Sequence, residues 1–135
     1  MSYALSGPLQ TAVFAELQSS VTLDNLVGDN IFDALPIGSL PQTYVAIGPE
    51  TATEAGDGTD DGAWHEFVVS VVTETAGFLT AKQAAGAISD TLHEADLALS
   101  RGRLVGLWFR KAKATRETGG IRRIDLTFRA RVEDN

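Results

Sequence analysis

The sequence predicts an α+β fold: a single compact domain over residues 1–135, with a mixed, mostly antiparallel sheet and two main helices packed on it. Three observations support this prediction. Two segments carry apolar residues at helical spacing, strand-like segments follow each of them, and the last strand alternates strictly between apolar and polar residues. The length is that of one ordinary domain. We therefore expect the order helix, strands, helix, strands.

The first helix is expected over residues 6–20. Its start carries Ser6 and Pro8, because a serine hydroxyl can cap the free N–H groups of the first turn and a proline there loses no hydrogen bond. Apolar side chains then recur at helical spacing, at Leu9, Val13 and Leu17. One face of this helix should therefore pack on the sheet.

Glycines and prolines interrupt residues 21–41, so we expect only short extended pieces there, around residues 31–32. Residues 42–47 are rich in strand-forming side chains and predict a strand. Residues 48–62 carry five acids and no base. Because such a segment has little to bury, it predicts a surface loop.

Residues 64–75 predict a central strand covered on each side, since both of its faces are largely apolar. The second helix is expected over residues 78–94, with a stripe of small and apolar side chains at helical spacing. The stripe consists of Ala81, Ala85, Ile88, Leu92 and Ala95. A short extended piece is expected at residues 97–99.

Two long strands, residues 103–115 and 121–132, should be joined near residues 118–120. The last strand places one set of residues on a core and another on a polar face. The core set is Ile124, Leu126, Phe128, Ala130 and Val132, and the polar set includes Arg123, Asp125, Thr127, Arg129 and Arg131.

Charge is divided unevenly along the chain. The net charge is −7, but residues 1–100 hold 14 acids and one base, whereas residues 101–135 hold 4 acids and 10 bases. Two interpretations stay open. Opposite charges can neutralise one another inside one molecule, or the folded chain can present an acidic and a basic face, which suits head-to-tail contacts between copies.

Known catalytic patterns are missing from the sequence. There is no cysteine and no motif of the serine hydrolase, phosphate-loop or zinc protease type. His65 and His93 are expected to be surface or helix-cap histidines. Residues 57–62 approach a calcium loop, but the position that should supply a bidentate glutamate is Val68, inside a strand. We expect no enzyme activity, no cofactor and no metal.

The sequence also argues against nucleic acid and membranes as partners. The basic C-terminal segment lacks interleaved aromatic residues and the chain is acidic overall, so sequence-specific nucleic-acid recognition is not expected. No apolar run is long enough to span a membrane, and the first residues do not resemble a secretory signal. These features predict a soluble protein made in a cytoplasm.

Seven segments in the same order and spacing resemble the tail-completion family of long-tailed phages, and especially the tail terminators of gene transfer agents. They are residues 9–15, 33–36, 41–48, 65–67, 77–88, 102–105 and 122–131. The resemblance implies a structural virion protein that forms a ring of six copies on the head-proximal end of the tail tube. It also implies that the ring stops tube growth, joins the head-side stopper and lets DNA pass through without specific binding.

The resemblance makes the two-faced charge pattern a hypothesis about contacts. Candidates for the contact with a neighbouring subunit are Arg103, Arg110, Arg123, Arg129 and Arg131. Candidates for contact with the tube, the stopper or the lumen are Glu50, Glu54, Asp57, Asp60 and Asp61. Another head–tail connector ring, or a small ligand-binding or enzymatic α+β domain with a pocket around His65 or His93, remains an alternative.

Overall fold

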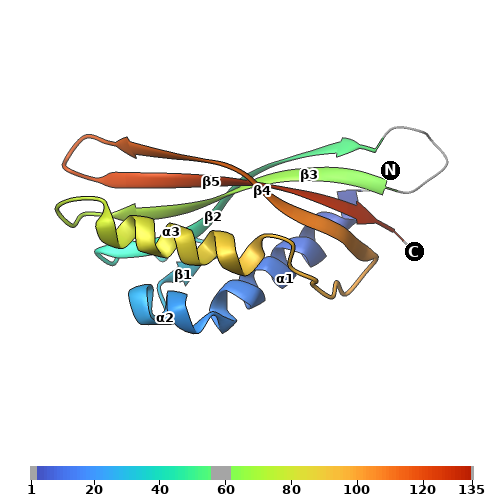
Figure 1. Ribbon diagram of the computed structural model, residues 1–135, viewed down its shortest axis with the longest axis horizontal. Coiled ribbons are helices and arrows are strands. Elements are labelled where there is room, and N and C mark those ends of the chain that lie inside the picture. The colour runs from blue at the N-terminus through green and yellow to red at the C-terminus, as the bar shows by residue number, and fades with distance from the viewer. Residues whose placement is uncertain (1–2, 56–61, 135) are drawn as a thin grey trace.

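The computed structural model describes residues 3–55 and 62–134, and in it one sheet is covered by helices on one face only (Figure 1). The strands are β1 (Ile31–Phe32), β2 (Thr43–Glu54), β3 (Gly62–Thr73), β4 (Arg103–Arg116) and β5 (Arg122–Glu133). The helices are α1 (Ser6–Ser19), α2 (Val21–Val27) and α3 (Leu79–Leu92), preceded by a short 3-10 helix (Tyr3–Leu5). The predicted α+β class is confirmed.

The strand order in the sheet is β1-β2-β3-β5-β4. β1 pairs in parallel with β2, whereas the other three pairs of neighbours are antiparallel. The sheet is therefore mixed and mostly antiparallel, as predicted. β3 is the middle strand, and β5, the last strand of the chain, is inserted between β3 and β4. The β4–β5 turn closes with the Glu117 N–H donating to the Ile121 carbonyl at 2.7 Å.

The core lies between the sheet and the helix layer. All five apolar residues that the alternation in β5 assigned to the core are at most 3% exposed. α1 contributes Leu9, Val13 and Leu17 to the same core. From α3, four residues of the predicted stripe are buried: Ala81, Ala85, Ile88 and Leu92. Small side chains on α3 let the helix lie close to the strands.

α2 is a helix that the sequence analysis did not predict. It is only seven residues long, which is too short to persist alone in water. Ser20 caps it, because its Oγ accepts a hydrogen bond from the Leu23 N–H at 3.2 Å. Leu23 and Val27 are buried one turn apart. The cap and the buried pair stabilise this helix. It was not predicted because the glycines and prolines of residues 21–41 indicated an irregular segment.

The predicted loop over residues 48–62 is wrong for its first part, because β2 continues to Glu54. The register against β3 shifts between Ile47 and Glu50, so a β-bulge accommodates Gly48 and Pro49 within the strand. A regular strand would send Ile47 and Glu50 to opposite faces. With the bulge, both side chains face α1. Residues 56–61 lie outside the described residues.

Two further expectations need correction. β3 is not covered by helices on both sides: on its open face Ser70 and Val72 are buried beside Arg123 of the adjacent strand β5. Ser6 does not cap α1, because the 3-10 helix precedes it and Leu5 occupies the cap position. Residues 97–99 form no strand.

Candidate functional site

The face of the sheet that no helix covers carries the polar residues of β5. Arg123, Arg129 and Arg131 all lie on this open face, partly exposed. The predicted polar face of the last strand is therefore real, and it faces away from the helix layer. Their role in subunit contact remains a prediction.

Arg129 lies flat over an aromatic side chain. Its guanidinium carbon is 3.9 Å from the centre of the Trp64 ring, and Trp64 in turn contacts Trp108 with 6.1 Å between ring centres. The register explains this grouping: Trp64 stands opposite Arg131 and Trp108 stands opposite Arg129. Three strands thus bring two tryptophans and two arginines together on the open face.

The other predicted interface arginines differ in how far they are already neutralised. Arg123 pairs with Asp125 at 2.8 Å and donates to the Ser70 hydroxyl. Arg103 pairs with Glu133 at 3.0 Å. Arg110 is exposed on β4 beside the register shift between Phe109 and Lys111. The charges of Arg123 and Arg103 are therefore largely neutralised by acids of the same molecule.

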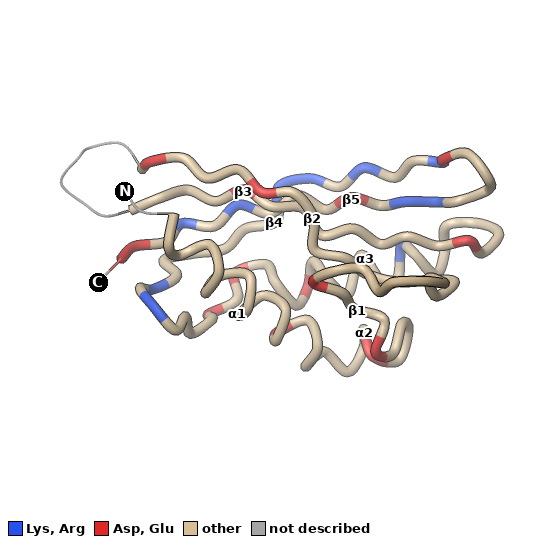
Figure 2. The backbone as a smooth tube through the Cα atoms, turned by 180° about the vertical axis from the view of Figure 1, so that it is seen from behind, with Lys and Arg blue, Asp and Glu red and all other residues tan. Residues whose placement is uncertain are grey.

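The ion pairs of the C-terminal segment bear on the two interpretations of the charge pattern. Four arginines pair with acids of that same segment. Arg101 pairs with Asp134, Arg103 and Arg131 pair with Glu133, and Arg123 pairs with Asp125 and Glu117. The acids of the helix layer lie elsewhere: they follow the helices and their connections, whereas nine of the 11 bases lie on β4 and β5 (Figure 2). The two-faced arrangement is the one that the structure favours.

A buried polar cluster around Glu50 was not predicted. Its Oε1 accepts hydrogen bonds from the Tyr3 hydroxyl at 2.6 Å and the Ser6 hydroxyl at 2.7 Å. Its Oε2 lies 3.2 Å from Nδ1 of His65. Burial alone would raise the pKa of Glu50, but the hydrogen bonds from Tyr3, Ser6 and His65 and the electrostatic interaction with His65 outweigh it. The pKa of Glu50 consequently lies below its usual value.

His65 is fully buried, so its assignment as a surface or cap histidine was wrong. The alternation of β3 could have indicated this, because His65 shares its face with Phe67 and Val69. The partner of His65 could not be read from the sequence, since Glu50 reaches it only through the bulge in β2. Glu50 is for the same reason removed from the candidates for outward contact.

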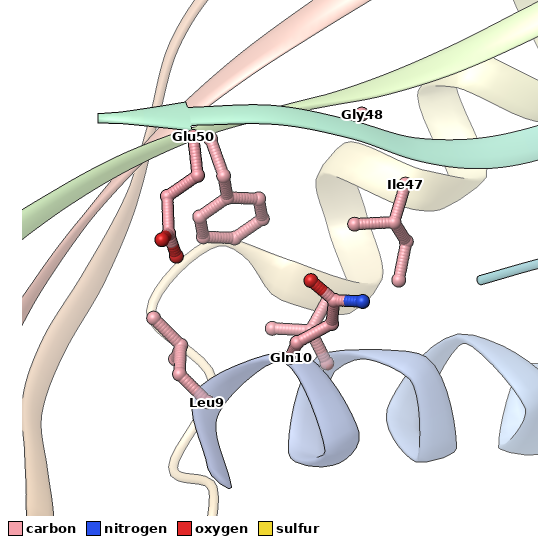
Figure 3. Close-up of a pocket in the computed structure, with 7 residues that line it drawn as sticks. Leu9, Gln10, Ile47, Gly48 and Glu50 are labelled. Carbon is pink, nitrogen blue, oxygen red and sulfur yellow. The ribbon is translucent and has the colours of Figure 1, made fainter. Parts of the chain in front are cut away.

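The His65–Glu50 pair does not open into a substrate site. The nearby hollow between α1 and β2 is only about 10 Å³, close to the space of one water molecule. In Figure 3, Glu50 and Ile47 point from β2 toward Leu9 and Gln10 of α1. The cluster links the start of the chain to the middle strand of the sheet, so its role is to stabilise the fold.

The remaining sequence candidates are distributed as follows. His93 is exposed at the end of α3, where its Nδ1 accepts from the Phe109 N–H at 3.0 Å, in keeping with the cap assignment. Glu54 ends β2. Asp57, Asp60 and Asp61, together with most of the calcium-like loop, lie outside the described residues. Within residues 3–55 and 62–134 there is no group of three side chains that could hold a metal ion.

Among the helices described, none has the length and apolar character needed to cross a bilayer. The fold and its surfaces define a small α+β subunit with oppositely charged faces. The chain belongs to the family of tail completion proteins, because the family model described as tail completion protein gp17 matches residues 11–133. This confirms the resemblance drawn from the sequence.

A solved structure adds a second finding. A chain in the virion of a native gene transfer agent particle is 57% identical to this one and superposes with a TM-score of 0.92. The match covers 98% of this chain and 99% of that chain. No curated protein matches the sequence. The resemblance to gene transfer agents is thereby confirmed as well.

Glu50→Gln should lower the free energy of unfolding by about 1–3 kcal/mol at neutral pH, because a buried hydrogen-bonded carboxylate is lost. The pKa of Glu50 is lower in the folded state. Its stabilisation is thus complete above the ordinary glutamate pKa and is lost as pH falls through the lower folded value. Urea titrations across acidic pH should show the two proteins converging. Glu74→Gln, at an exposed position just after β3, is the control. If the difference in free energy of unfolding between Glu50→Gln and the unchanged protein stays the same at every pH, the lowered pKa of Glu50 is contradicted.

Proposed function

We propose that the chain is a structural tail terminator of a gene transfer agent or phage-like particle and has no enzymatic role. It forms a ring, in our proposal a hexamer, on the head-proximal end of the tail tube. The ring stops addition of tube subunits and joins the tail to the head-side stopper, and DNA passes through it without sequence-specific contacts. Membership of the tail completion family and the similarity to a virion chain support this proposal.

The observation that carries the ring is the separation of charge between the two layers. A closed ring with more than two subunits needs a contact between two different patches of the same chain. The acidic helix layer and the basic open face are unlike and lie on opposite sides of the sheet (Figure 2). Attraction between them also orients the approaching subunits before contact.

Within the basic face, Arg129 and Arg131 are the strongest candidates for the neighbouring acids. Arg129 is held by an aromatic ring rather than by a carboxylate. Among the described residues, the acid paired with Arg131 is Glu133, at 3.9 Å from its Nη2. Arg103 and Arg123, which are paired at 3.0 Å or less, contribute less to this contact. Arg110 adds charge at the edge of the sheet.

The acids at the β2–β3 connection are proposed to face the tube, the stopper or the lumen. This role now falls to Glu54, Asp57, Asp60 and Asp61, because Glu50 is turned inward. Negative charge along a channel would repel DNA phosphates and keep the passage free.

Arg129→Glu with Arg131→Glu should abolish ring assembly while the monomer stays folded, because two attractive charges become repulsive. Electron microscopy of the purified ring or tail end gives the readout, and circular dichroism checks folding. Arg101→Glu with Arg116→Glu is the control, since it makes the same charge change at exposed positions outside the proposed contact. Normal rings from the first variant would remove these arginines from the interface.

Neutralising the β2–β3 acids, with Asp57→Asn, Asp60→Asn and Asp61→Asn, should leave rings intact but impair joining to tube or head, or DNA delivery. Counting complete particles and measuring transferred DNA tests this. Glu66→Gln, Glu74→Gln and Glu117→Gln remove an equal charge at exposed positions outside the helix layer as the control. Unchanged assembly and delivery would refute a contact or lumen role for these acids.

Deleting the gene should yield headless tails of uncontrolled length, visible by electron microscopy of the particles. Tails of regular length that fail to attach to filled heads would instead indicate a head-side connector, such as a stopper or adaptor. Intact ordinary particles would contradict any structural role.

A further inference from the structure

We propose that Trp64, Trp108 and Arg129, here called the indole platform, seat on the hollow between α2 and α3 of a second copy of the chain. The proposal rests on the ring proposed above and identifies the two patches that meet in it. One patch lies on the open face of the sheet, and the other lies in the helix layer on the opposite side.

The platform is built flat by two glycines. A Cβ atom at Gly106 would lie 2.3 Å from Cη2 of Trp108, so the indole ring lies directly on the backbone there. A Cβ atom at Gly62 would lie 2.5 Å from Nη2 of Arg131, whose guanidinium likewise lies against the strand. Trp108 therefore lies along the sheet, and it is partly exposed there beside Trp64, which is partly exposed and has Arg129 over its ring.

The polar edge of the platform has unused hydrogen-bonding capacity. Arg129 contacts the Trp64 ring but has no hydrogen-bond acceptor among the described residues. A guanidinium carries five N–H donors and pairs best with a carboxylate. Tryptophan and arginine together are the residues that most often anchor protein interfaces. The platform therefore fits an apolar surface with a carboxylate beside it.

The helix layer of the same chain offers such a surface. The hollow between α2 and α3 has a volume of about 470 Å³ and is lined by Thr22, Asn25, Leu26, Gln83, Gly86, Ala87 and Asp90. One water molecule needs only about 10–15 Å³ by the same measure, so the hollow is wide enough for an indole ring. Leu26 and Ala87 supply apolar contact, and Asp90 supplies an exposed carboxylate for Arg129.

Charge and geometry favour a second copy over other occupants. The hollow lies in the acidic layer, whose only base in a helix is Lys82. Nucleic acid fits the platform poorly, because exposed Glu66 stands opposite Arg129 in the strand register and would repel phosphates. Since the platform and the hollow lie on opposite layers, the contact repeats head to tail, as a ring requires.

The absence of cysteine from the sequence permits a direct cross-linking test. Thr53 borders the platform and Gln83 lines the hollow, and both are exposed, so Thr53→Cys combined with Gln83→Cys, which leaves Asp90 in place, should give a ladder of disulfide-linked chains when assembled particles are oxidised. Thr53→Cys combined with Asp96→Cys is the control, because Asp96 is an exposed acid outside the hollow. Rings seen by microscopy without the ladder would overturn the platform contact yet leave the ring proposal standing.

Substitutions provide a second, independent test. Trp64→Leu with Trp108→Leu should weaken self-association by at least about thirtyfold, the size expected for interface anchors. Arg129→Asp and Asp90→Arg should each weaken it alone, and the combined variant should recover it. Rings that survive all of these changes, or a Thr53→Cys product linked to a different protein, would overturn the proposal. Tails without any ring from the wild-type chain would overturn the ring proposal as well.

Discussion

Five apolar side chains of β5 enter the space between the sheet and the helices, and this one-sided burial is the constraint on which the rest of the structure depends. Alternation leaves the other side of the strand polar. Because β5 lies between β3 and β4, its polar residues form the middle of the open face. All three helices must then gather on the remaining face, and the acids in and between them gather with them.

The charge of the two layers follows from the order of the chain rather than from any local pairing. The helices and their connections come from the acidic first part, and the two basic strands come from the last part. Arginines of the last part pair with acids of that same part, so the acids of the helix layer are not used to neutralise them and the layers keep their opposite charges. A molecule of this kind is attracted to copies of itself in one relative orientation, and salt weakens that attraction.

Sequence reasoning succeeded where periodicity was regular. The alternation in β5 and the stripe on α3 identified both elements and their buried faces. It failed at β2 because Gly48 and Pro49 resemble a strand end, and only the pairing with β3 shows that they form a bulge. The inward turn of Glu50, and with it the partner of His65, could not be predicted without this bulge, whereas the burial of His65 was readable from the alternation of β3. The platform was missed for another reason: Trp64 and Trp108 are 44 positions apart, and register alone brings them together.

The position of β5 also has a consequence for how the chain is made. The final strand is an interior strand of the sheet, so β3 and β4 have no common neighbour until residues 122–133 have been synthesised. The core cannot close before that point, because the pairings of β5 with both of its neighbours need the completed strand. Pairings between distant segments form slowly. A premature stop only a dozen residues early would therefore divide the sheet instead of trimming its edge.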